Sequence, residues 1–340
     1  MKLGNLNIGD DQKPLIIPEI GINHEGDFDK AVKMIKDIAK SGAKCVKFQC
    51  HVIEDEMIEN DVIPPNANET IWNMMKRCSF SESEEIELKK ISEDLGLVYL
   101  STPFSREAAN RLERMNIDGF KIGSGECNNF PLIKHIASFG KPVILSTGMN
   151  EIQSIQKAVK ILEEFNLEYA ILHVTSMYPT PYENVRLRVL NELKEKFPKA
   201  IIGLSDHSIG NYTSFAAIGL GAKIIEKHFT SDKKWPGPDI PVSIDPSELK
   251  DLIYGCNAIF SALEGTKNIL EGEKATANFA YASVVTTKDL EKNEVISEDN
   301  IWVKRPGTGE ILAEYYEQLI GKKVSKKVTK NTQLKWDMIE

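Results

Sequence analysis

The chain has 340 residues, 41% of them hydrophobic, which suffices for one large core plus a smaller domain and excludes a disulfide-dependent miniprotein. Acidic residues outnumber basic ones by 50 to 42, and a net charge of −8 without a basic run argues against a nucleic-acid partner. Five cysteines without a Cys-x-x-Cys pair indicate reduced thiols, and no apolar run has membrane length. We therefore expect a cytoplasmic protein with no membrane partner.

Eight short apolar runs rich in Val, Ile and Leu recur along the first two thirds of the chain. Each ends in a polar or glycine cluster, and stretches with a helical apolar period fill the intervals between them. This alternation predicts an α/β fold, a closed (β/α)₈ barrel of the TIM type, with an open doubly wound sheet as the lesser alternative. The predicted strands are 15–21, 44–50, 98–104, 119–125, 142–148, 170–176, 200–206 and 223–229.

Two further segments interrupt or follow the predicted barrel. The interval 51–97 is too long for one crossover helix, and residues 52–75 suggest an insertion above the second strand. After a helical pattern at 249–265 comes a polar stretch typical of a linker, then short strands broken by turn-forming sequences. We expect a barrel domain at 1–265, a linker at 266–280 and a small, mostly β domain at 281–340 that needs a docking partner for stability.

Polar side chains gather where the predicted strands end, the position at which a barrel builds its active site. Any one of them could be a hydrogen-bonded core residue or a helix cap. Their burial at one mouth, however, requires the charged groups to neutralise each other or a ligand, which favours a shared functional site. In chain order the set is Glu19, Asn23, Glu25, Lys47, Gln49, His51, Ser101, Thr102, Lys121, Ser124, Glu126, Ser146, Thr147, Ser176, Tyr178, Ser205, His207, Glu226 and His228.

Two kinds of chemistry fit this set. Lys47 and Lys121, with hydroxyls and the turns GSG and STG, predict an anion pocket for a phosphate and a carboxylate, although the turns alone could be ordinary β-to-α connections. His207 and His228 end adjacent strands and could bind one divalent ion, or form a hydrogen-bonded structural pair. Glu226 shares a strand face with His228 and could orient a metal-bound water or pair with a lysine.

Several motifs occur in an order and spacing that resemble a known family. They are EIGINHEG, KFQCHVIEDEM, STPFS, FKIGSGECNNFPLIK, STGM, YPTPYE, GLSDHS, EKHFT and GPDI, followed by FAYASVV and NIWVKRPGTG near the end. Together they resemble the sialic acid synthases, with a C-terminal antifreeze-like (SAF) domain, over nearly the whole chain. The resemblance implies a transferase of sialic acid biosynthesis, an N-acetylneuraminate synthase. Such an enzyme condenses phosphoenolpyruvate with N-acetylmannosamine and water, releases phosphate and uses Mn²⁺ or Mg²⁺.

The resemblance also implies roles for individual residues. His207 and His228 match the metal ligands, and Glu25, Glu126 and Lys121 stand at catalytic positions. Tyr178 and Asp239 would face the sugar. The family forms homodimers that exchange C-terminal domains, so that an arginine matching Arg305 reaches the sugar's N-acetyl group in the partner's barrel. The residues matching the phosphoenolpyruvate pocket are Lys47, Gln49, Thr102, Lys121, Ser124, Ser146, Ser176 and Ser205.

Departures from the family pattern leave the sugar open. KFQCH replaces the more usual KHQTH, Ser176 replaces an Asn found in some relatives, and KKWPGPDIPVS departs around Asp239. Related synthases make legionaminic or pseudaminic acid from diacetamido hexoses, and an animal branch uses the 6-phosphate of N-acetylmannosamine. Outside this group, the chain could be a non-catalytic sugar-binding barrel. It could also be another phosphoenolpyruvate-aldehyde condensing enzyme, although those lack the antifreeze-like tail.

Overall fold

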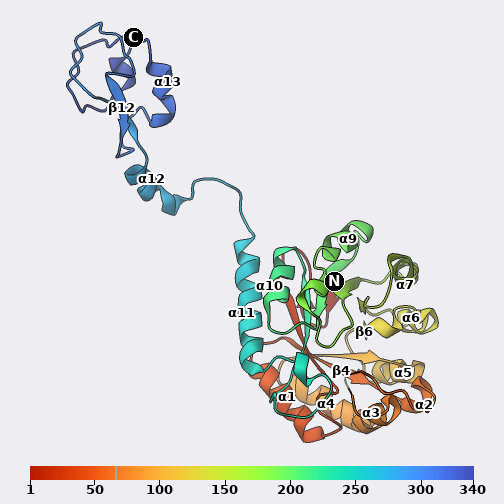
Figure 1. Ribbon diagram of the computed structural model, residues 1–340. Coiled ribbons are helices and arrows are strands. Elements are labelled where there is room, and N and C mark those ends of the chain that lie inside the picture. The colour runs from red at the N-terminus through yellow and green to blue at the C-terminus, as the bar shows by residue number, and fades with distance from the viewer. Residues whose placement is uncertain (66) are drawn as a thin grey trace. The chain divides into compact units, whose positions relative to one another are not determined.

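The computed structural model describes residues 1–65 and 67–340, which divide into two compact units at 1–264 and 265–340. In the first unit, eight parallel strands alternate with helices, and the helices lie outside the strands (Figure 1). Within the described residues, parallel ladders join seven neighbouring pairs in the order β5-β4-β3-β10-β9-β8-β7-β6. Strands β5 and β6 lie side by side and complete the ring. The predicted (β/α)₈ barrel is confirmed.

The barrel strands fall at the predicted runs, with ends that shift by a few residues. The fourth is the shortest, because the chain leaves the ladder at Gly123 and turns into a 3₁₀ helix, Ser124–Glu126. Nearly every strand residue is buried, as expected for strands covered on both faces. The strands are β3 (Leu15–Gly21), β4 (Cys45–Cys50), β5 (Val98–Pro103), β6 (Phe120–Ile122), β7 (Val143–Ser146), β8 (Tyr169–Val174), β9 (Ile201–Asp206) and β10 (Ile224–His228).

The helices that follow the strands are amphipathic, and their apolar faces pack on the outer side of the sheet in one large core. Local signals fix where several begin: Ser81 and Glu84 form a capping box before α4, and Asp245 and Glu248 form another before α11. The helices are α1 (Phe28–Lys40), α4 (Glu82–Asp94), α5 (Arg106–Arg114), α6 (Phe130–Ala137), α7 (Ile152–Glu164), α9 (Val189–Lys196), α10 (Tyr212–Gly219) and α11 (Pro246–Ala262).

The barrel interior is apolar at the amino ends of the strands and polar at their carboxyl ends. A short N-terminal hairpin, β1 (Lys2–Leu3) and β2 (Leu6–Asn7), places Leu3 and Ile8 in the same buried cluster as inward-facing strand residues such as Ile17 and Leu172. No apolar run in the sequence predicted this hairpin. An apolar plug at the amino ends of the strands leaves their carboxyl ends as the place for polar chemistry.

The region between β4 and β5 contains the predicted insertion as two short helices, α2 (Ile53–Glu56) and α3 (Ile71–Cys78). Met74, Met75 and Cys78 of α3 form a small hydrophobic cluster with Ile22 and Ile53. The insertion is thus anchored to the loop that follows β3. Asn66, in the predicted insertion, lies outside the described residues.

The second unit contains a two-stranded antiparallel sheet, β11 (Ser283–Thr286) and β12 (Ile301–Lys304), and a short helix, α13 (Tyr316–Leu319). Isolated bridges such as Leu290 to Val328 join its other extended segments, so its regular strands are shorter than the sequence pattern suggested. A hydrophobic cluster including Val284 and Leu334 forms its core. A short exposed helix, α12 (Lys274–Ala280), occupies part of the predicted linker. Among the residues described, no helix has both the length and the apolar character that a membrane crossing requires.

Candidate active site

A cavity of about 190 Å³ opens at the carboxyl ends of the barrel strands. Twelve of the residues to which the family resemblance assigns a role line it. They are Lys47, Gln49, Thr102, Lys121, Ser124, Ser146, Ser176, Tyr178, Ser205, His207, His228 and Asp239. The inward parity of the strands brings these side chains together, because alternate residues of each strand face the barrel axis.

Four buried charges form a cluster at the base of this cavity: Lys47, Lys121, Glu19 and Glu226. Lys47 Nζ lies 2.7 Å from Glu19 Oε2 and 3.8 Å from Glu226 Oε2, and Lys121 Nζ lies 3.7 Å from Glu226 Oε1. The two lysines are thus balanced by two carboxylates, as buried charges require. Uncharged donors and acceptors complete the cluster: Lys47 donates to Thr102, Lys121 to Ser146, Ser205 to Glu226 and Gln49 to Glu19.

Burial and pairing act in opposite directions on these groups. Burial opposes the charge of Lys47, but attraction to Glu19 and Glu226 outweighs it and raises the pKa of Lys47. Burial lowers the pKa of Lys121 to about 8, although Glu226 partly opposes the shift. Burial raises the pKa of Glu19 to about 7 against the attraction of Lys47. For Glu226, burial is outweighed by Lys121 and Lys47, so its pKa is lowered.

Beside the charge cluster, hydroxyl groups converge around Gly148, at the turn that follows β7. Gly148 N–H donates to Ser124 Oγ over 3.0 Å, and Asn150 braces the turn by donating to the carbonyls of Ser124 and Gly148. A Cβ on Gly148 would lie 2.3 Å from Ser176 Oγ and 2.9 Å from Ser124 Oγ. The absence of a side chain therefore allows these hydroxyls to approach the backbone, an arrangement suited to oxyanions.

The two histidines end β9 and β10 with ring centroids 5.4 Å apart. His207 Nδ1 lies 3.0 Å from the Thr175 carbonyl oxygen, a contact that requires a proton on Nδ1 and leaves Nε2 with a lone pair. Burial lowers the pKa of His207 to about 4 and holds the pKa of His228 well below its usual value, so both rings are neutral near pH 7. His228 Nδ1 is buried with no hydrogen-bond partner within 1–65 and 67–340. Neutral imidazoles with a free nitrogen are the form that binds metals.

Tyr178 and Asp239 form the side of the cavity next to the histidines. The Tyr178 ring stacks on His207 with centroids 4.2 Å apart, and Asp239 Oδ2 lies 3.8 Å from His228 Nδ1. Burial and the nearby Glu25 raise the pKa of Asp239 to about 6. In the described part of the chain, no group of three or more His, Cys, Asp or Glu side chains could hold a metal. Any ion on the two histidines would therefore need water or substrate oxygens.

Three of the residues to which the family resemblance assigns a role lie outside the cavity lining. Glu25 follows β3 and lines a neighbouring pocket with Arg77 and Gly237. Glu126 ends the 3₁₀ turn after β6, where Asn129 donates to it over 2.6 Å. Burial raises the pKa of Glu126. Arg305 belongs to the second unit and follows β12, with its guanidinium 6.0 Å from the Phe279 ring centroid.

Family models match both units of the chain. The model of the NeuB family matches residues 34–268, which is more than half of the chain, and that of the SAF domain matches residues 281–340. The chain belongs to the NeuB family. It is an enzyme of that family, and the resemblance to the sialic acid synthases is confirmed.

Relatives of this NeuB-family enzyme differ in the sugar acid that they make. The chain is 38% identical to N,N'-diacetyllegionaminic acid synthase of Campylobacter jejuni, over 93% of this chain and 97% of that protein. It is 33% identical to human N-acetylneuraminate-9-phosphate synthase, over 93% and 90%. A solved N-acetylneuraminic acid synthetase from Leptospira borgpetersenii superposes with a TM-score of 0.75 at 32% identity, over 81% and 94%.

Phe104 and Met149 line the cavity of this NeuB-family enzyme but were not predicted, and Glu19, which belongs to the predicted strand-end set, was given no role. Glu19 had a usable signal, since it shares the inward parity of Ile17 on β3 and pairs with Lys47 in the ladder. Phe104 and Met149 come from connections after β5 and β7, where strand parity no longer fixes side-chain direction.

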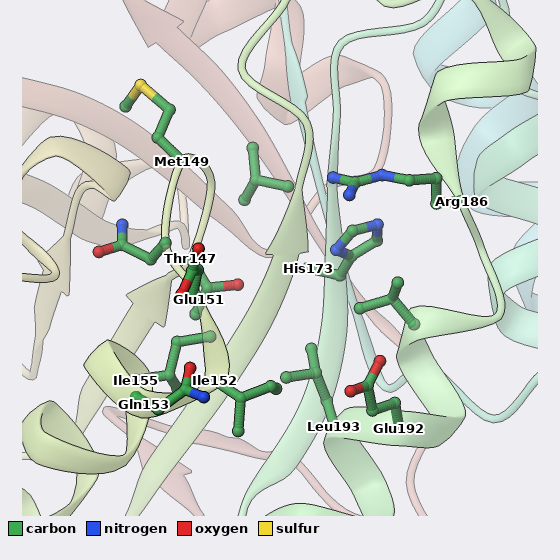
Figure 2. A pocket seen from close by; sticks show the side chains of 13 residues that line it. Thr147, Met149, Glu151, Ile152, Gln153, Ile155, His173, Arg186, Glu192 and Leu193 are labelled. Carbon is green, nitrogen blue, oxygen red and sulfur yellow. The ribbon is translucent and has the colours of Figure 1, made fainter.

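A larger hollow, about 540 Å³, lies beside the cavity between the beginning of α7 and α9 (Figure 2). In Figure 2, Met149, Thr147 and Glu151 lie on one side of it and Arg186 and His173 on the other. His173 Nε2 is already bonded to the Val185 carbonyl at 2.7 Å. The hollow lacks the buried cations of the cavity, so its size does not make it the better site.

Proposed function

We propose that this chain condenses phosphoenolpyruvate with N-acetylmannosamine and water to give N-acetylneuraminate and phosphate. The observation that carries the proposal is the joining of three features in one cavity: two buried lysines, a hydroxyl cradle at Gly148 and a pair of neutral histidines. Lysines and hydroxyls suit the phosphate and carboxylate of phosphoenolpyruvate. The uncharged histidine side suits a neutral sugar.

The chain's residues would hold phosphoenolpyruvate at the base of the cavity. Lys47 and Lys121 would pair with its anionic groups, and Ser124, Ser146 and Ser176 would donate to its oxygens. The four-charge cluster is already hydrogen-bonded to Gln49, Thr102 and Ser205, which would hold the lysine side chains in position. Fixing the enol phosphate in one orientation would present its C3 to the sugar's aldehyde carbon.

A divalent ion, Mn²⁺ or Mg²⁺, fits the histidine pair. His207 Nε2 has a lone pair because Nδ1 donates to a carbonyl, and His228 Nδ1 lacks a hydrogen-bond partner in the described ranges. When bound, such an ion polarises a carbonyl oxygen as a Lewis acid. A chelator should abolish condensation and spare phosphoenolpyruvate binding in calorimetry. Loss of both would place the ion on the phosphate instead.

Two carboxylates outside the cavity lining would serve the later steps. We assign Glu126 to stabilising the cationic C2 that forms once the carbon–carbon bond is made, and Glu25 to activating the water that attacks it. Phosphate would then leave the tetrahedral intermediate. Glu126→Gln should lower kcat by about 100-fold while both substrates still bind. Near-normal turnover of that variant would refute the role given to Glu126.

The second candidate is a diacetamido hexose in place of N-acetylmannosamine, with legionaminic or pseudaminic acid as product. The relative named N,N'-diacetyllegionaminic acid synthase, at 38% identity, favours it. Turnover with phosphoenolpyruvate, metal and each of three sugars decides: N-acetylmannosamine, its 6-phosphate and diacetamido hexoses. We expect the highest kcat/KM with N-acetylmannosamine. A diacetamido preference would establish the alternative, and no phosphate release with any sugar would mean a non-catalytic barrel.

We also propose a homodimer in which the second unit of one copy covers the barrel mouth of the other. Large apolar side chains are exposed around that mouth, with Met149 76% and Tyr212 75% accessible, and Ile58 85% accessible in the insertion. Such exposure on an isolated chain is typical of a surface that a partner covers. A cytoplasmic location is proposed from the five buried, unpaired cysteines.

A further inference from the structure

The loop between β3 and α1 holds Glu25 in an unusual backbone conformation. Its φ is +55°, in the left-handed region that residues other than glycine seldom adopt. Such a conformation persists only where surrounding contacts over-determine it, and it is common in functional sites.

Arg77, the penultimate residue of α3, makes two hydrogen bonds to Glu25. Its Nη1 donates to Glu25 Oε2 over 2.8 Å and to the Glu25 carbonyl oxygen over 3.3 Å. Its Nη2 donates to Glu69, which comes from the insertion and fixes the other side of the guanidinium. One planar cation thus fixes the backbone and the side chain of Glu25 together, which a lysine could not do with the same geometry.

The C-terminal end of α3 packs against the loop that contains Glu25. A Cβ on Gly26 would lie 2.2 Å from the Arg77 carbonyl oxygen, so only glycine allows the two backbones to approach this closely. The His24 ring stacks on Phe80 with centroids 4.4 Å apart. Arg77 is therefore carried on an element that cannot shift without moving the Glu25 loop.

The hydrogen bonds from Arg77 occupy Oε2 and the carbonyl oxygen of Glu25 but not Oε1. Oε1 is buried and has no hydrogen-bond partner among the residues described. It faces Gly237, where an added Cβ would lie only 3.2 Å away, and Glu25 lies near enough to Asp239 to affect it electrostatically. Glu25 Oε1 therefore points toward the loop that contains Gly237 and Asp239, and Asp239 forms part of the cavity wall.

We propose that Arg77 is a positioning residue that fixes Glu25 so that Oε1 is presented to the reacting water, with Glu69 keeping Arg77 in place. This inference rests on the proposed function, in which Glu25 activates water. It assigns a task to the insertion, because Glu69 and Arg77 both come from it. The insertion would then act on chemistry without touching phosphoenolpyruvate.

The test compares Arg77→Met with Arg77→Lys, Glu69→Gln and a matched control, Arg114→Met. Arg114 also pairs with two glutamates, Glu82 and Glu107, away from the cavity. Arg77→Met should lower kcat by about 100-fold with the KM for phosphoenolpyruvate unchanged, because a misplaced group costs about that much. Arg77→Lys should recover only part of the loss, Glu69→Gln should lose less, and Arg114→Met should match the parent enzyme.

Guanidinium rescue separates positioning from mere support of the fold. Added methylguanidinium should restore kcat to Arg77→Ala, and full kcat in a folded Arg77→Met would overturn the inference. Loss of activity with a lowered Tm and no rescue would overturn it too. If the parent enzyme turns over no sugar, the proposed function fails, and a structure of Arg77→Met decides the positioning separately. Glu25 leaving its positive φ there supports it, and an unchanged Glu25 refutes it.

Discussion

The base of the cavity and its rim are built by different means. At the base, Lys47, Lys121 and Glu226 project from barrel strands whose neighbours fix each side chain through ladder register. At the rim, a hydrogen bond from Arg77 of the insertion holds Glu25 in place, and a 3₁₀ turn positions Glu126. Charges at the base balance each other inside the barrel, whereas the rim groups need contacts from other segments.

Removing Lys47 tests the base most severely. Lys47→Met leaves Glu19 buried without its 2.7 Å partner, so we expect a loss of about 3–5 kcal/mol in the free energy of unfolding and no phosphoenolpyruvate binding. Urea denaturation and calorimetric titration measure the two effects. In the double variant Lys47→Met/Glu19→Leu, stability should partly return while binding stays lost. Binding retained in Lys47→Met would show that the base does not hold the anion.

The hydroxyl cradle gives a milder test of the base. In Gly148→Ala the added methyl lies 2.3 Å from Ser176 Oγ, and relieving such overpacking costs about 1–3 kcal/mol. We expect phosphoenolpyruvate affinity to fall about 10- to 100-fold, with sugar KM little changed. Gly219→Ala is the control, since a Cβ there meets nothing within 4 Å. Equal effects on both substrates would argue against a cradle specific to phosphoenolpyruvate.

Strand periodicity explains why the geometry of the base could be predicted and the contacts that hold the rim residues could not. Inward parity from apolar neighbours such as Ile17 and Ile224 extends to Glu19 and Glu226, so their placement follows once the barrel is recognised. The N-terminal hairpin gave no signal, because two-residue strands are too short for periodicity. The contact of Arg77 with Glu25 joins residues 52 apart through an irregular insertion, and no local pattern predicts such a pairing.

Arg305 tests the rim. If it reaches the sugar's N-acetyl group in a partner copy, Arg305→Ala should raise the sugar KM about tenfold and leave phosphoenolpyruvate binding unchanged, as expected for one charge-assisted hydrogen bond. Lys304→Ala is the matched control, since Lys304 bonds to Asn331 within its own unit. Co-expression of Arg305→Ala with Lys121→Met should restore activity through mixed dimers. No restoration would refute the exchange of C-terminal units.

The pH dependence of stability should have opposite signs at the rim and at the base. Burial lowers the pKa of His24, beneath the Glu25 loop, to about 3 and raises that of Glu19 to about 7. For His24 the unfolded chain binds more protons between pH 3 and 6.5, so its contribution to stability is lost as pH falls through that window. For Glu19 the folded chain binds more protons between pH 4.5 and 7, so its contribution is lost as pH rises.

Chelated samples of His24→Gln and Glu19→Gln, unfolded in urea from pH 4.5 to 7, measure both signs. The stability advantage of the parent over His24→Gln should grow with pH by about 1 kcal/mol per unit, and its advantage over Glu19→Gln should shrink. Because each difference cancels the groups that parent and variant share, the sign belongs to the substituted residue. Slopes of the same sign would mean that the rim histidine and the base carboxylate do not titrate as their burial dictates.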